Sequence, residues 1–232
     1  MRKVLTALLV ILATNVFALD NIWDMRYTFG PDSRPSPKLG FGLGARSDFN
    51  PDVLFPINIT GRLTRNFDIG SKVNIQTSDK MNHLQASLDI GGRFRFDQTT
   101  FFELDGYFGL NRNNGSAIVL TIGSDQVISK NFLNYYEARV GVLDGVAGDG
   151  GYVKFALGMT PTLIFGRLLR CMVEVNASGS AGHLRRDFMI DILPKFELAL
   201  GNVRIRLDFD IGVMQEKNND RYGIGLYVMT AL

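Results

Sequence analysis

Residues 187–214 read DFMIDILPKFELALGNVRIRLDFDIGVM. Every second residue is apolar from Phe188 to Leu200 and again from Val203 to Val213, with Gly201-Asn202 between the two runs. Side chains alternate between the two faces of a β-strand, and a Gly-Asn pair between alternating runs favours a tight turn. The stretch therefore predicts a β-hairpin with one wholly apolar face.

The turn also determines which residues of the hairpin lie opposite each other. With Leu200 opposite Val203, opposite charges meet on the polar face: Glu197 with Arg206 and Lys195 with Asp208. Each such pair is expected to stabilise the register by roughly 0.2–1 kcal/mol. Two classes of protein contain such hairpins. In a soluble β protein the apolar face points to the core, whereas in an outer-membrane barrel it faces lipid and the charges line the interior.

The same alternation recurs along the rest of the chain. The expected strands are residues 39–45, 57–63, 69–75, 84–96, 102–110, 118–122, 136–142, 153–159, 169–177, 188–200, 203–213 and 224–232. With 25 glycines and 7 prolines, the 232-residue chain has the composition of many strands joined by turns. We expect an all-β fold, a single antiparallel up-and-down transmembrane β-barrel of twelve strands, with ten strands as the alternative.

The links between the expected strands alternate in length. Brief links lie around residues 65–66, 97–99, 166–167 and 201–202. Longer polar links cover residues 46–53, 77–82, 111–116, 144–151, 178–186 and 215–221. Short turns on one side and longer loops on the other are typical of outer-membrane barrels, with both termini on the periplasmic side. The link at residues 124–131 breaks this pattern.

Phenylalanines gather beside the short links. They are Phe67, Phe96, Phe101, Phe102, Phe132 and Phe165. Aromatic side chains form girdles where a membrane barrel meets the interface, and a soluble core has no reason to collect them at one end. A closed barrel of about eight strands is already only just filled by side chains, so a larger soluble protein would have to form a sandwich. A soluble secreted or periplasmic β-sandwich that binds a ligand is the alternative to the membrane barrel.

The N-terminus indicates export. Met1-Arg2-Lys3 is positive, residues 4–16 are largely apolar, and Ala18 supplies the small residue after which a signal peptidase cuts. Residues 1–18 are therefore expected to be a cleaved signal peptide, with the mature chain starting at Leu19. The apolar run is shorter than the roughly twenty residues that a membrane-spanning helix needs. Residues 19–35 are expected to form a periplasmic lead-in or a plug in the barrel mouth, and residues 36–232 the barrel.

With this signal, the alternating runs and the last strand YGIGLYVMTAL at residues 222–232, the chain resembles the broad class of Gram-negative outer-membrane β-barrel proteins. No single family within that class matches. The resemblance implies a location in the outer membrane, contact with its lipid and lipopolysaccharide, and insertion by the barrel-assembly machinery. In that class the last strand usually ends in an aromatic residue, whereas this chain ends in Leu232.

Sequence marks of catalysis are sparse. The chain has no P-loop, C-x-x-C, H-E-x-x-H or G-x-S-x-G motif, so no cofactor, metal or enzymatic activity is expected. The net charge of +2, without a polybasic run, gives no sign of a nucleic-acid partner. Cys171 is the only cysteine and lies on an apolar face. His83 and His183 at the long-loop end could serve an outer-membrane hydrolase, although chance placement in polar loops explains them as well.

The polar faces of the expected strands carry both signs of charge. The candidate lumen-lining residues are Arg93, Arg95, Glu103, Asp105, Glu137, Arg139, Lys195, Glu197, Arg204, Arg206, Asp208 and Asp210. Because cations and anions are mixed, little ion selectivity is expected. The sequence therefore predicts either a small, passive, porin-like channel for small solutes or a structural barrel whose lumen is filled by paired charges.

Overall fold

The structure is a computed structural model. It describes Phe29 and residues 36–48, 52–78, 83–110, 116–143, 151–182, 186–215 and 222–232. The expected signal peptide and its cleavage point between Ala18 and Leu19 lie outside the described residues, as does all of residues 19–35 except Phe29. Among the described residues, no helix is long and apolar enough to cross a membrane.

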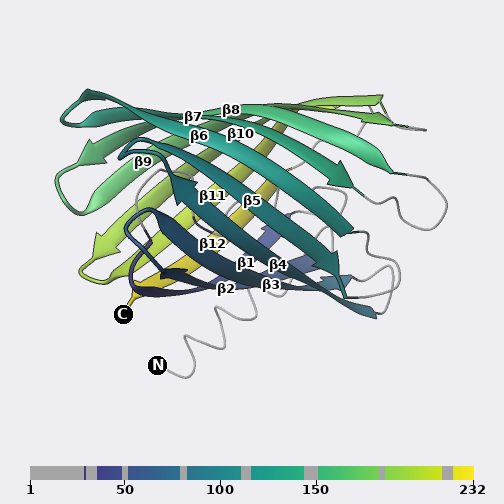
Figure 1. Cartoon of the computed structure of the whole chain (residues 1–232), viewed down its shortest axis with the longest axis horizontal. Coiled ribbons are helices and arrows are strands. Elements are labelled where there is room, and N and C mark those ends of the chain that lie inside the picture. The colour runs from purple at the N-terminus through teal and green to yellow at the C-terminus, as the bar shows by residue number, and fades with distance from the viewer. Residues whose placement is uncertain are drawn as a thin grey trace.

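The described strands form one closed antiparallel barrel (Figure 1). They are β1 (Leu39–Asp48), β2 (Asp52–Arg62), β3 (Phe67–Ser78), β4 (His83–Arg95), β5 (Thr100–Gly109), β6 (Ser116–Ser129), β7 (Phe132–Leu143), β8 (Tyr152–Phe165), β9 (Leu169–Gly182), β10 (Arg186–Leu200), β11 (Val203–Gln215) and β12 (Tyr222–Ala231). Each strand pairs with the next along the chain, and β1 pairs with β12 to close the ring. The predicted twelve-stranded, up-and-down architecture is confirmed.

The hairpin of β10 and β11 has the register expected from its turn. Leu200 lies opposite Val203, which places Glu197 opposite Arg206 and Lys195 opposite Asp208. Gly201 has a φ of 61°, a left-handed conformation that glycine adopts without steric cost. The Gly-Asn pair therefore makes the tight turn that the sequence predicted.

The link between β6 and β7 differs from the expectation. Residues 124–131 were expected to form a long link, but β6 continues to Ser129 and only residues 130–131 form the turn. Backbone pairing with β7 outweighs the polarity of Ser124, Asp125 and Gln126, so this link joins the short-turn side. At the long-loop end, some links are shorter than expected because small polar residues continue a strand. For example, β9 extends to Gly182 and β10 begins at Arg186.

The turn between β4 and β5 is held by a carboxylate. Asp97 accepts hydrogen bonds from the Thr99 backbone N–H at 2.6 Å, the Thr99 hydroxyl at 2.8 Å and the Thr100 backbone N–H at 2.7 Å. The bond from the Thr99 backbone, together with the others, holds the pKa of the Asp97 carboxyl below its usual range. This short turn is therefore defined by its own side chain.

The outer surface of the barrel is apolar. Large exposed hydrophobic side chains lie on all twelve strands, among them Leu104, Ile118 and Leu157. Their neighbours on the opposite face are polar and buried, as Glu103 shows with 3% exposure beside Leu104 with 48%. A soluble sandwich would bury the apolar face and expose the charges. The observed arrangement is the one that lipid requires.

One of the expected girdle residues points inward. Phe96 and Phe165 are exposed at the short-turn end, but Phe101 is fully buried inside the barrel. Phe101 lies two residues before Glu103 on β5 and both are buried, so the two side chains share the inner face. Counting aromatics beside a turn does not distinguish the two faces, and strict alternation places Phe101 on the polar side.

The seam between β1 and β12 is rich in glycine on its inner face. Gly44 lies opposite Tyr227, and the Tyr227 ring occupies the space in which a Cβ of Gly44 would lie. A Cβ on Gly225 would lie 2.8 Å from the same ring. On the neighbouring strand β11, the Arg206 guanidinium lies 4.7 Å from the centre of the Tyr227 ring. These glycines therefore make room for one tyrosine along the seam.

We expect cysteines at Ala45 and Leu226 to form a disulfide, because these residues lie opposite each other across the seam. The background should carry Cys171→Ala. A matched control is the pair at Phe41 and Leu226, since Phe41 lies opposite Thr230 instead. Non-reducing mass spectrometry of the folded protein measures the bond. Equal crosslinking of both pairs would show that the seam has no fixed register.

Arginine substitutions on one strand should reveal depth in the membrane. Leu207→Arg, near the middle of β11, is expected to cost about 2–4 kcal/mol, and Val203→Arg, beside the turn, about 0–1 kcal/mol. Both residues lie on the outer face of the same strand. Urea unfolding in lipid vesicles gives the two free energies. Equal losses would contradict a lipid-facing outer surface.

Candidate functional site

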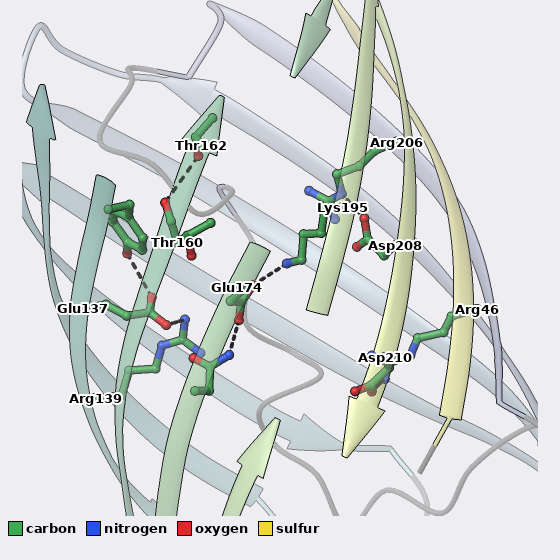
Figure 2. A network of polar contacts seen from close by, with 12 residues as sticks. Arg46, Glu137, Arg139, Thr160, Thr162, Glu174, Lys195, Arg206, Asp208 and Asp210 are labelled. Atoms are coloured by element: carbon green, nitrogen blue, oxygen red, sulfur yellow. Dashed lines mark hydrogen bonds and ion pairs between the residues drawn. The ribbon is translucent and has the colours of Figure 1, made fainter. Parts of the chain in front are cut away.

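The candidate site is the inner wall of the barrel, where charged side chains from neighbouring strands meet (Figure 2). The twelve predicted lumen-lining residues all lie on strands of the barrel. Nine of them are buried, Asp105 and Asp208 are partly exposed, and Arg204 is exposed near the Gly201-Asn202 turn. Whether they line a water-filled path stays a prediction.

Strands β3, β4 and β5 carry one group of ion pairs. The pairs are Arg93 with Glu103, Arg95 with Asp68, and Lys72 with Asp89. Glu103 accepts from Nε of Arg93 at 2.8 Å and from Nη2 at 2.5 Å, a two-point contact that fixes the guanidinium plane. All six side chains are at most 6% exposed. Asp68 was missed from the sequence because the strand was expected to begin one residue later, at Ile69.

A second group lies on β7, β9 and β10. Glu137 accepts a hydrogen bond from the Tyr135 hydroxyl at 2.9 Å and pairs with Arg139. Glu174 accepts from the side-chain amide of Asn176 at 2.6 Å and pairs with Lys195 of the neighbouring strand. Figure 2 shows Glu137 and Arg139, and likewise Glu174 and Lys195, pointing toward each other inside the barrel. Both carboxylates are thus buried and have partners.

The ion pairs of the opening hairpin differ from the expected ladder. The backbone register is correct, but Lys195 pairs with Glu174 of β9 and Arg206 pairs with Asp208 of its own strand at 2.8 Å. Lys195 lies opposite Met172 on β9, and Glu174 is its diagonal neighbour. Diagonal positions remain within reach of long side chains, so register alone does not select the partner.

An aromatic stack joins the two groups. The rings of Phe101 and Tyr135 are stacked with centroids 6.1 Å apart and planes 10° apart. The Arg93 guanidinium lies 3.9 Å from the Phe101 ring centre. Gly123 makes the stack possible, because a Cβ there would lie 2.6 Å from both Phe101 and the Tyr135 hydroxyl. The alternation of side chains along β5 could have placed Phe101 on the inner face, because it lies two residues from Glu103.

The described residues contain no group of three or more His, Cys, Asp or Glu side chains that could hold a metal ion. Cys171 is a free, half-buried thiol. His183 and the side chain of His83, on which the hydrolase alternative depends, lie outside the described part of the chain.

Comparison with solved structures identifies the fold. The barrel of a KdgM porin in complex with disordered oligogalacturonate matches with a TM-score of 0.60, 9% identity, 83% of this chain and 99% of that chain. The fold is that of a bacterial outer-membrane β-barrel. The translocator domain of the autotransporter NalP from Neisseria meningitidis matches with a TM-score of 0.60 and 9% identity over 90% and 93% of the two chains. LpxR from Salmonella typhimurium matches with a TM-score of 0.55 and 6% identity over 84% and 99%.

No protein-family model matches the sequence, and no curated protein matches it either. At identities of 11% or less, the solved structures establish the shared barrel and not a shared activity. Together with the apolar outer surface, this fold indicates a protein of the bacterial outer membrane.

Breaking the buried pair of Glu174 and Lys195 should be costly. Lys195→Met leaves the Glu174 carboxylate buried without its cation and is expected to cost about 3–5 kcal/mol, whereas the double variant Glu174→Leu with Lys195→Met should recover most of that loss. Arg204→Met, at an exposed position, is the control. Urea unfolding monitored by heat-modifiable gel mobility completes the double-mutant cycle. Additive losses would show that the two residues do not act as a pair.

Proposed function

We propose that this protein is a narrow passive channel for small hydrophilic solutes in the outer membrane. A closed ring of twelve strands encloses more space than the ring of about eight strands that side chains just fill. Its inner face is polar and its outer face apolar, so the polar path runs inside the barrel. Three of the similar solved structures have the word porin in their descriptions.

The observation that carries the proposal is the charge-paired inner wall. Cations and carboxylates neutralise each other along the wall, as in Arg93 with Glu103 and Lys195 with Glu174. Clefts lined by one sign of charge concentrate the opposite ion, and a wall on which the two signs are paired lacks that feature. We therefore expect weak ion selectivity. This wall gives no reason to extend the acidic oligogalacturonate of the KdgM complex to this protein.

A structural barrel with a filled lumen is the second candidate. It is favoured by the burial of inner side chains, because Asp68, Glu174 and Asn176 have no exposed surface. A wide, water-filled lumen would leave such groups accessible. The two candidates differ in whether the folded protein passes ions.

The membrane setting supplies the proposed partners. The exposed apolar side chains of all twelve strands would contact lipid, with lipopolysaccharide around the long-loop end. The barrel-assembly machinery would insert the chain, and β12, which ends at Ala231 just before the exposed Leu232, is the segment that it would engage. These partners follow from the proposed location.

Planar-bilayer recording of the purified protein tests the channel. Small current steps are expected, with a reversal potential near zero under a potassium chloride gradient. Arg204→Glu should move the reversal potential toward cation preference, because Arg204 lies at the inner wall beside Glu197 at 3.6 Å. Arg65→Glu makes the same charge change in the exposed turn before β3 and should leave it unchanged.

Absence of current from protein that shows heat-modifiable gel mobility would favour the filled structural barrel. A strong preference for one ion in the unmodified protein would contradict the neutral wall.

A further inference from the structure

The described residues before β1 contact the inner wall at two points. Phe29 lies 5.0 Å, ring centre to guanidinium carbon, from Arg93. Seven residues later, the Ser36 backbone N–H donates to the Asp68 carboxylate at 2.9 Å. Both wall residues are buried on the inner side of β3 and β4. The Phe29 side chain therefore lies inside the barrel, against a residue of its wall.

Several hydrogen bonds hold Ser36 against the barrel wall. The Ser36 carbonyl accepts from Arg62 through Nε at 2.8 Å and Nη2 at 2.5 Å. The Arg62 backbone N–H in turn donates to the carbonyls of Pro37 and Lys38. Asp68, which receives the Ser36 N–H, also pairs with Arg95. Ser36 is 6% exposed, so this contact is part of the packed interior.

Phe29 lies at one end of a series of contacting groups that continues through Arg93 and Phe101 to Tyr135. Arg93 lies 3.9 Å from the Phe101 ring, and Phe101 stacks on Tyr135. The Phe29 ring contacts Arg93 as well, and it reaches the inner side of β4, where a Cβ on Gly91 would lie 3.2 Å from it. Oε2 of Glu103 accepts hydrogen bonds from two nitrogens of the Arg93 guanidinium, which positions that group beside Phe29.

We infer that Phe29 closes the lumen of its own barrel, with the layer formed by Arg93, Phe101 and Tyr135 as its seat. A cation between aromatic rings is attracted by the faces of both rings, and the attraction is stronger in a water-poor site. This inference rests on the proposed channel.

Photocrosslinking tests the seat without any need for conduction. The photoreactive residue p-benzoylphenylalanine at position 29 of the full chain should crosslink to peptides of β4 and β5 in the folded protein, as read by mass spectrometry. The same residue at position 41, a phenylalanine on the outer face of β1, should not reach those peptides. Absence of β4 and β5 crosslinks from position 29 would overturn the inference.

Bilayer recording tests the closing role. Phe29→Ala should increase the mean current per inserted barrel, Phe29→Tyr should keep it at the wild-type level, and Phe41→Ala serves as the control. Crosslinking at position 29 with unchanged current in Phe29→Ala would show that Phe29 sits in the lumen without closing it. If crosslinking succeeds and no variant conducts, the proposed channel fails, and Phe29 is a permanent filling of the barrel and not a gate.

Discussion

Closure of the backbone ladder between β1 and β12 is the constraint on which the rest of the structure depends. A bilayer core offers no water to unpaired N–H and C=O groups, so every strand needs a partner on both sides. Once the ring closes, each strand has one face toward lipid and one toward the lumen. The alternation in the sequence is therefore a direct consequence of closure, and it recurs from Leu39 to Ala231.

Closure also explains why inner charges pair with one another. A carboxylate such as Glu174 faces neither bulk water nor lipid, so its charge is stabilised only by neighbours on the same inner face. It finds Lys195 on the next strand and Asn176 two residues along its own. The network is thus a requirement of the fold before it is a feature of any transport path.

The sequence predicted what depends on period and turn chemistry. The β10–β11 register, the twelve strands and the pairing of β1 with β12 all follow from alternation and from Gly201-Asn202. Contacts within the inner face did not follow. Lys195 has one carboxylate directly opposite, Asp208, and another at a diagonal position, Glu174. Side-chain packing decides that it pairs with Glu174. Phe101 was misplaced because its position beside a turn was given more weight than its parity with Glu103. The contact between Phe29 and Arg93 joins segments distant in sequence, so no local pattern could indicate it.

Two prolines interrupt the backbone pairing of the barrel wall at the level of one buried ion pair. Between β8 and β9, the two residues between Met159 and Thr162 have no backbone partner on β9. Between β10 and β11, the two residues between Ile192 and Lys195 have no backbone partner on β11. Pro161 and Pro194 lie in these gaps, where proline has no N–H to donate to a ladder. The pair formed by β9 and β10 therefore has a weakened ladder on each outer side. Glu174 and Lys195 are bonded across β9 and β10 at this same level, since Glu174 lies opposite Leu193 and Lys195 follows Pro194. The buried ion pair thus adds a side-chain bond to the continuous β9–β10 ladder at the level where the ladders on either side of it are interrupted.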